Sequence, residues 1–477
     1  MRGFLASSIG VTCAAALALP LAPPAAGTTA RPVPTAEAPA TPTGAGRSSY
    51  VPGGTQSLPL EPLPRDRASG AAEQGLPRRD VRHFSLVGVV WDEPGTELHG
   101  RVQVRTRAVG TGTWSAWQEL ETHHADHGAD PGTAERGSGR VRGATAPLWV
   151  GESDGVEVRV RAEHTRGTGS GTRAAGAPAA GGLPSGLRLE LVDPGRDAAV
   201  PPPDGTPDDA ADTPGSGAHG APGAQSAESV TASAVNADLA PLGAIEIPEL
   251  SRAQTESELL ALGAGVLTGQ QQKVKPYVGP RPRIVTRRGW GADEKLREKK
   301  FAYTKKVKAA FVHHTASGNN YHCSQAPSVI RSIYRYHVRS MGWRDIGYNF
   351  LVDKCGKIYE GRAGGVAKPV LGAHTLGFNS NSMGIAVLGT YNSTKPSSSA
   401  VKAIARLAAW KLGLYGMNPR GKTYLKSAGG NLYRKGKNVR LNVISGHRDG
   451  FVTDCPGRKL YGKLGTARSA AARYQGR

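Results

Sequence analysis

The last third of the chain carries the residue types of a catalytic zinc site. His313 and His314 end a short apolar run, His447 follows Gly446, and Cys455 comes eight residues later. Two imidazoles and one thiolate can bind Zn²⁺ and leave its fourth position open, which distinguishes a catalytic zinc from a structural one. If His313, His447 and Cys455 converge, the chemistry they support is hydrolysis, because the ion can activate water and polarise a carbonyl.

Hydroxyl groups near these residues could assist such a reaction. Tyr348 and Thr453 are of the right type to stabilise an oxyanion or to move a proton. Residue chemistry alone leaves a structural interpretation open, since adjacent histidines are more often structural and the spacing of His447 and Cys455 is not that of a zinc finger. Three further histidines compete for ligand roles, namely His322, His337 and His374.

Strands and helices of mixed order surround these residues. Apolar runs predict strands at 309–313, 385–388 and 443–444, and a hairpin over 350–359 around the turn Asp353-Lys354-Cys355-Gly356. Helix caps and a 3.6-residue period predict helices over 324–337 and 397–413. The pattern predicts an α/β domain over 279–470, with a mixed central β-sheet flanked by helices and a basic inserted loop at 416–440.

The upstream half predicts an all-β, sandwich-like module over 80–195. Segments 101–105 and 156–161 alternate polar and apolar residues, as half-buried strands do. His123, His124 and His127 could suggest a metal, but beside Asp126 and Gly128 they are predicted to lie in a solvated loop.

Two segments are expected to be disordered, because they are rich in Pro, Ala and Gly. These are 31–79 and 196–278, the second with one short helix near 256–262.

The first thirty residues are typical of a secretion signal, with a basic start, an apolar run at 4–21 and small residues at 25–27. We therefore expect a secreted or cell-wall protein. Export would remove Cys13 and leave Cys323, Cys355 and Cys455, an odd number. Outside the cell two thiols should pair, and zinc ligation would give the third a reason to stay unpaired. An intermolecular disulfide or an inert thiol is the alternative.

Charge is unevenly divided along the chain. Of its 60 Lys+Arg and 38 Asp+Glu, residues 1–270 carry 21 and 30, a net −9, and residues 271–477 carry 39 and 8, a net +31. Such a field attracts polyanions. Nucleic acid, anionic lipid and anionic wall polymers all qualify, as does a simple contribution to solubility. No nucleic-acid motif accompanies the charge, and we expect neither a nucleic-acid nor a membrane partner.

Residues 281–465 resemble the peptidoglycan recognition protein family, the type 2 zinc N-acetylmuramoyl-L-alanine amidases. The resemblance implies a zinc amidase that cleaves the bond between N-acetylmuramic acid and L-alanine, with peptidoglycan and muropeptides as partners, anionic wall polymers as further candidates, and a monomeric state. The β-rich module resembles the region upstream of the amidase in exported actinobacterial relatives. The motifs that carry the resemblance follow in family order: Arg288-Gly289-Trp290-Gly291-Ala292, Val312-His313-His314-Thr315-Ala316, Asp345-Ile346-Gly347-Tyr348-Asn349-Phe350, Tyr359-Glu360-Gly361-Arg362, Gly372-Ala373-His374-Thr375, Asn381-Ser382-Met383-Gly384-Ile385 and Gly446-His447-Arg448-Asp449.

The same resemblance implies roles for single residues. His313, His447 and Cys455 would hold Zn²⁺, Tyr348 would stabilise the attacked carbonyl, and Thr453 would lie beside the zinc-bound water. Cys323 and Cys355 would form the disulfide. The expected substrate-binding set is His314, which also has a structural role, with Gly342, Trp343, Arg362, His374 and Asn379.

Two details of the resemblance bear on the substrate. Gly342-Trp343 together with Arg362 is associated in the family with diaminopimelate-type peptides, whose extra carboxylate a guanidinium can bind in bidentate fashion. Family members that bind peptidoglycan without cutting it usually lack the cysteine ligand. Cys455 therefore favours catalysis, and a non-catalytic peptidoglycan-binding protein is the alternative.

Overall fold

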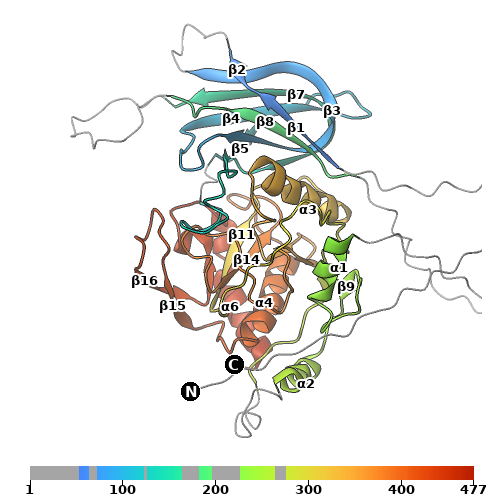
Figure 1. The fold of residues 1–477 in the computed structure, drawn as a ribbon, viewed down its shortest axis with the longest axis vertical. Helices are drawn as coiled ribbons and strands as arrows, with labels where there is room; N and C mark the ends of the chain where they lie inside the picture. Colours follow the sequence, from blue (N-terminus) through green and yellow to red (C-terminus); the bar gives the residue numbers. More distant parts are fainter. Residues whose placement is uncertain (1–52, 64–71, 123–125, 164–181, 196–225, 264–275) are drawn as a thin grey trace, which may run out of the picture. The chain divides into compact units, whose positions relative to one another are not determined.

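Three β-sheets organise the described part of the chain, which in this computed structural model comprises residues 53–63, 72–122, 126–163, 182–195, 226–263 and 276–477 (Figure 1). An eight-stranded sheet lies in the N-terminal half, and a seven-stranded sheet and a two-stranded sheet lie in the C-terminal half. No helix among these residues is both long and apolar enough to cross a membrane. The predicted secretion signal lies outside the described residues.

The N-terminal module is built from antiparallel strands, in the order β1-β8-β3-β7-β4-β5, with β2 and β6 paired to β3. Its buried core includes Phe84, Trp91 and Leu189, and Val102 and Val104 point inward from β4 with the predicted alternation. The prediction of an all-β module is therefore confirmed. The strands are β1 (Gly54–Pro59), β2 (Glu61–Pro62), β3 (Glu73–Trp91), β4 (Gly100–Ala108), β5 (Gln118–Leu120), β6 (Gly143–Ala144), β7 (Leu148–Ala162) and β8 (Arg188–Asp193).

The prediction that residues 31–79 are disordered is wrong where β1, β2 and the start of β3 form. β1 pairs along its length with β8, the strand that contains Leu189. Leu60, just after β1, belongs to the buried core of the module. β1 lies at the end of the sheet order, where a proline such as Pro59 is tolerated because no partner needs its missing N–H. A proline-rich composition therefore hid edge strands. Residues 31–52 and 64–71 lie outside the described residues.

The linker prediction for 196–278 is also wrong within 226–263. This part forms α1 (Ala227–Ala234), β9 (Glu246–Ile247) and α2 (Arg252–Gly263), and the predicted short helix lies within α2. β9 pairs with β10 (Ile284–Val285), and Ile247 is fully buried. These short pieces gain their stability by packing on the second domain, which a local pattern does not reveal. Residues 196–225 and 264–275 lie outside the described residues.

The seven-stranded sheet has the order β17-β11-β14-β12-β13-β10-β9. β11 pairs in parallel with both β14 and β17, whereas β12 and β13 form an antiparallel hairpin, so the predicted mixed sheet is confirmed. The predicted loop at 416–440 contains a hairpin. The remaining strands are β11 (Ala309–His314), β12 (Phe350–Val352), β13 (Ile358–Glu360), β14 (Ser382–Val387), β15 (Lys422–Lys426), β16 (Asn438–Asn442) and β17 (Ile444–Gly446).

Helices flank this sheet as predicted. They are α3 (Ala326–Arg335), α4 (Ser398–Gly413), α5 (Arg458–Tyr461) and α6 (Leu464–Gln475), with short helical turns η2 (Cys323–Gln325), η3 (Tyr336–Ser340) and η4 (His447–Asp449).

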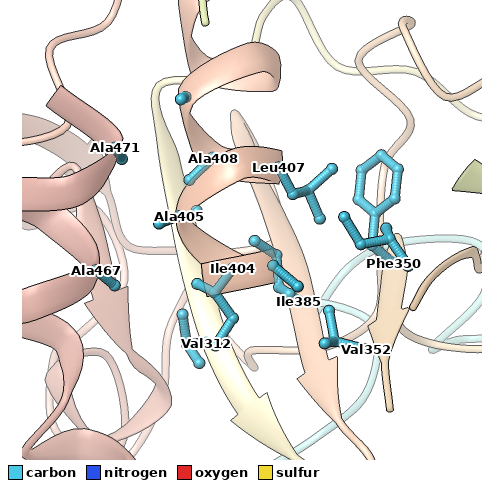
Figure 2. Packing of buried hydrophobic residues seen from close by; sticks show 14 of the residues in the cluster. Val312, Phe350, Val352, Ile385, Ile404, Ala405, Leu407, Ala408, Ala467 and Ala471 are labelled. Atoms are coloured by element: carbon cyan, nitrogen blue, oxygen red, sulfur yellow. The ribbon is translucent and has the colours of Figure 1, made fainter. Parts of the chain in front are cut away.

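One face of the sheet is covered by α4. The Ser397 side chain caps this helix by accepting a hydrogen bond from the Ala400 amide at 3.0 Å. Figure 2 shows Ile404 and Leu407 packing toward Val312 and Ile385 of the central strands. Ala310 and Val312 of β11 point into this apolar layer, so His313 points to the other face of the sheet.

The helix α3 is buried on more than one side. Ile330 and Ile333 belong to one apolar cluster that also contains Leu86 and Val192 of the β-rich module. The Tyr336 hydroxyl, just after α3, donates a hydrogen bond to the Thr145 carbonyl at 3.1 Å. The two modules therefore share a continuous core along α3.

A disulfide joins Cys323, at the start of the α3 region, to Cys355 in the β12–β13 turn. The two residues are 32 positions apart in sequence. Among the described cysteines Cys455 is left unpaired, and it is buried.

Removal of this disulfide should destabilise the protein. We expect Cys323→Ala/Cys355→Ala to lower the free energy of unfolding by about 2–4 kcal/mol, because the crosslink restricts the unfolded chain. Denaturant titration measures the difference. A reductant should produce the same loss in the wild type and none in the double variant; a reductant effect that persists in the variant would contradict the assignment.

Candidate metal centre

The pairing of β11 with β17 brings the first two candidate ligands together. The strands are parallel, and Val312 lies opposite Gly446. His313 is the next residue on β11, His447 follows the end of β17, and their ring centroids are 4.5 Å apart. Because side chains alternate along a strand, Val312 faces α4 and His313 faces the opposite side. His314 turns away again, and its Nδ1 accepts a hydrogen bond from the Tyr391 amide at 3.2 Å.

Cys455 returns to the same point through the turn after η4. Its Sγ lies 3.7 Å from His313 Nδ1, and its amide donates to Thr453 Oγ1 at 3.1 Å. Zinc bonds of about 2.0–2.1 Å to nitrogen and 2.3 Å to sulfur imply an N···S separation of roughly 3.6 Å in a tetrahedral site. The spacing of His313 and Cys455 is therefore that of two ligands of one ion.

A fourth donor comes from the β-rich module. One ligand atom each from His127, His313, His447 and Cys455 lie within 4.8 Å of one another. His127 is 6% exposed, its Nδ1 is 2.7 Å from Asp126 Oδ1, and its Nε2 is 4.0 Å from Cys455 Sγ. The prediction of a solvated loop is therefore wrong for His127. His123 and His124 lie outside the described residues.

The environment of these donors suits Zn²⁺. Neither ring nitrogen of His447 has a hydrogen-bond partner among the described residues. Burial lowers the pKa of His313 well below its usual value and that of His447 to about 3, so both imidazoles are neutral and able to ligate. Burial also raises the pKa of the Cys455 thiol, so its thiolate requires an adjacent cation.

His374 lies behind the site. Its Nδ1 is 3.3 Å from His313 Nε2, and the residue is fully buried. The structure therefore places it where it can orient a ligand. Of the other two competing histidines, His322 is exposed and His337 stacks on Trp343 with ring centroids 4.4 Å apart.

Tyr348 stands beside the donors, just before β12. Its ring centroid is 5.5 Å from that of His313. Burial raises the pKa of Tyr348 well above its usual value, so its hydroxyl stays protonated and can donate a hydrogen bond. Thr453 is half-buried and near Cys455, where its hydroxyl accepts from the cysteine amide.

The remaining predicted substrate residues contact the β-rich module. The Arg362 guanidinium forms two hydrogen bonds to the Glu135 carboxylate, at 2.8 and 2.9 Å. Asn379 Oδ1 accepts from the amides of His374 and Thr375, and its Nδ2 donates to Asp130 Oδ1 at 2.7 Å.

Gly342 and Trp343 meet the same stretch of the module. Gly342 has φ 75°, and a Cβ built on it would come within 2.0 Å of the Arg140 carbonyl oxygen, so only glycine fits. Trp343 lies near Gly128.

The sequence did not indicate the contributions of His127, Asp130 and Glu135. These residues precede their partners by more than 170 positions. The local cluster of histidines and acidic residues at 121–130 was the one available signal, and it is equally typical of a solvated loop.

Comparisons with known proteins identify relatives of both halves of the chain. The model of the N-acetylmuramoyl-L-alanine amidase family matches residues 303–458, and the model described as Rv3811 N-terminal galactose-binding domain-like matches residues 28–181. The human protein named N-acetylmuramoyl-L-alanine amidase is 34% identical over 137 residues, which are 29% of this chain and 20% of that protein. A crystal structure of peptidoglycan recognition protein-LE in complex with tracheal cytotoxin is 30% identical, covers 38% of this chain and 92% of that chain, and has a TM-score of 0.30.

Relatives from flies match most of their own length. Peptidoglycan-recognition protein SC2 of Drosophila simulans is 31% identical over 185 residues, which are 38% of this chain and 85% of the relative. Its counterpart in Drosophila melanogaster is 30% identical over the same shares. By its sequence, its mixed sheet and the residues gathered at the end of β11, this chain belongs to the family of peptidoglycan recognition proteins and N-acetylmuramoyl-L-alanine amidases.

Proposed function

We propose that this chain is a zinc-dependent amidase that hydrolyses the bond between N-acetylmuramic acid and L-alanine in peptidoglycan. The observation that carries the proposal is the convergence of His313, His447 and Cys455 at the ends of β11 and β17, with Tyr348 beside them. Zinc held there supplies Lewis-acid chemistry and a water of lowered pKa.

The protein's own side chains would share the remaining work. The protonated Tyr348 hydroxyl donates a hydrogen bond to the oxygen of the attacked carbonyl, where negative charge develops in the transition state. His374 would hold the His313 ring in place through a contact between His374 Nδ1 and His313 Nε2. Thr453 orients the turn that carries Cys455 and places a hydroxyl next to the ligands.

Arg362 supports a preference for diaminopimelate-type stems. Its guanidinium is buried and binds the Glu135 carboxylate in bidentate fashion, which supports the idea that it could bind a substrate carboxylate in the same way. Diaminopimelate carries an additional carboxylate, and lysine at the same stem position does not. Gly342, Trp343 and Asn379 would line the same groove.

Secretion to the cell wall fits the rest of the chain. The disulfide between Cys323 and Cys355 requires an oxidising compartment to persist. The strongly basic C-terminal part would favour contact with anionic wall polymers.

One observation favours a second function. His127 supplies a fourth donor, and a four-ligand zinc site is of the structural type. A protein held in this state would be non-catalytic, and its function would be at most to bind peptidoglycan.

The metal assignment is testable by substitution of its sulfur ligand. We expect Cys455→Ser to reduce zinc affinity by more than the roughly 10–100-fold that loss of an outer-shell partner costs. Metal content after dialysis against a weak chelator measures the effect. His322→Gln, at an exposed histidine, should retain zinc; equal zinc in all three proteins would overturn the assignment.

The role of Tyr348 predicts a loss confined to the chemical step. We expect Tyr348→Phe to lower kcat by about 10²–10³ while zinc content and muropeptide affinity stay unchanged, because one oxyanion donor is removed. Release of muropeptides from purified wall, with and without chelator, provides the assay. An unchanged kcat, or activity that is indifferent to chelator, would contradict the mechanism.

The role proposed for Arg362 predicts a preference for diaminopimelate-type stems over Lys-type stems. Because Arg362→Ala alone would leave the buried Glu135 carboxylate unpaired, the comparison is Glu135→Ala against Glu135→Ala/Arg362→Ala. We expect the first to bind diaminopimelate-type stems more tightly than Lys-type stems, and the second to lose about 1.5–3 kcal/mol for the diaminopimelate type only. Calorimetric titration with both muropeptides tests this, and equal affinities throughout would refute it.

A further inference from the structure

Residues 126–142, here called the covering segment, contact the candidate metal centre through His127 and Arg362 through Glu135. The segment belongs to the β-rich module and precedes β6. Its main chain and side chains bond to the amidase domain at several points: Leu376 N to Asp126 O at 3.0 Å, Gly377 N to Asp130 Oδ1 at 2.7 Å, Arg344 N to Glu135 Oε1 at 3.2 Å and Arg142 N to Met341 O at 3.1 Å. Met341 and Arg344 precede Arg362 in the sequence, and Leu376 and Gly377 follow it.

Two contacts of the covering segment resemble those that the proposed substrate would make. One ligand atom of His127 lies within 4.8 Å of the three donors of the amidase domain, so this imidazole could take the fourth position of a zinc ion bound there. Glu135 presents a carboxylate to Arg362, and both side chains are 6% exposed. Burial raises the pKa of Glu135, but the Arg362 guanidinium and Arg344 together outweigh burial and lower that pKa below its usual value, so the pair is ionic.

We propose that the covering segment is an autoinhibitory element, which fills the substrate groove and completes the zinc coordination until it is displaced. The proposal rests on the function proposed above for the identity of the substrate. A segment that merely joined two domains would need neither a metal donor nor a carboxylate at the Arg362 guanidinium. The covering segment supplies both, and the two groups are only eight residues apart.

The base of the segment is closed within the β-rich module. The Ala146 amide donates a hydrogen bond to the Glu121 carbonyl at 2.8 Å, and the Thr145 amide donates one to the Val89 carbonyl at 2.9 Å. Within the segment, Ala129 and Val141 pack in the apolar cluster that also contains Ile330 and Ile333 of α3. Displacement of the segment would therefore leave the bonds of its base in place and would remove Ala129 and Val141 from that shared cluster.

The test uses the full chain and removes the contacts of His127 and Glu135. We compare wild type with His127→Ala, Glu135→Gln and the double variant, and use Glu119→Gln as a matched control, because Glu119 belongs to the same module but forms an exposed pair with Arg101. The probe is a muramoyl tripeptide that carries diaminopimelate. We expect the double variant to bind it roughly tenfold or more tightly than wild type, because opening no longer competes with binding, and the control to match wild type.

Zinc ligation gives a readout that does not depend on hydrolysis. X-ray absorption should count three imidazoles in the zinc-loaded wild type and Glu119→Gln, and two in His127→Ala. Three imidazoles in His127→Ala, or an affinity of the double variant no greater than that of wild type, would overturn the proposal. If binding tightens but no variant releases muropeptides, the amidase function fails while the occlusion stands.

A measurement on the unmodified protein covers the case in which the variants fold poorly. The Arg142 amide is protected from hydrogen exchange by its bond to Met341. Saturating muropeptide should accelerate exchange at Arg142 if it displaces the segment. Slower exchange would mean that the segment and the substrate bind together, and the proposal would be wrong.

Discussion

The parallel register between β11 and β17 is the constraint on which the candidate site depends. It sets His313 beside His447, and the alternation of side chains separates His313 from its neighbour His314. A slip of one residue would turn Val312 toward the ligands and His313 toward the apolar layer under α4. That apolar layer, which includes Ile385 and Ile404, therefore helps to hold the strand register that orients His313 toward the candidate metal centre.

A second constraint is the burial of α3 between the sheet and the β-rich module. Its apolar residues belong to a core that both modules share. Ile330 and Ile333 pack there with Leu86 and Val192 from the first half of the chain. The Tyr336 hydroxyl finds its acceptor in that half as well. The β-rich module is thus part of the same packed unit, and this packing holds residues 126–142 against the candidate site.

Local signals carried much of the fold, because they depend on neighbouring residues. The Ser397 cap and the apolar period of 398–413 identify α4, and short apolar runs identify β11 and β14. The candidate ligands His313, His447 and Cys455 were first named from their residue types, and a resemblance of ordered motifs then favoured them over the other histidines. The strands at 54–62 were hidden by prolines at a sheet edge. His127 and Glu135 were missed because their partners are distant in sequence, and a long-range contact leaves no period in the chain.

The covering segment and the amidase domain belong to one polypeptide. This connection affects how the segment competes with ligands in solution for the groove. Because His127 and Glu135 belong to the same polypeptide as the groove, their effective concentration there is independent of how dilute the protein is. Dilution therefore cannot remove them, as it would a separate inhibitor. For a protein that acts on peptidoglycan as proposed, dense arrays of stem peptides would raise the local concentration of the competitor. Occupancy of the site by the covering segment would then depend on the density of the polymer that the protein meets.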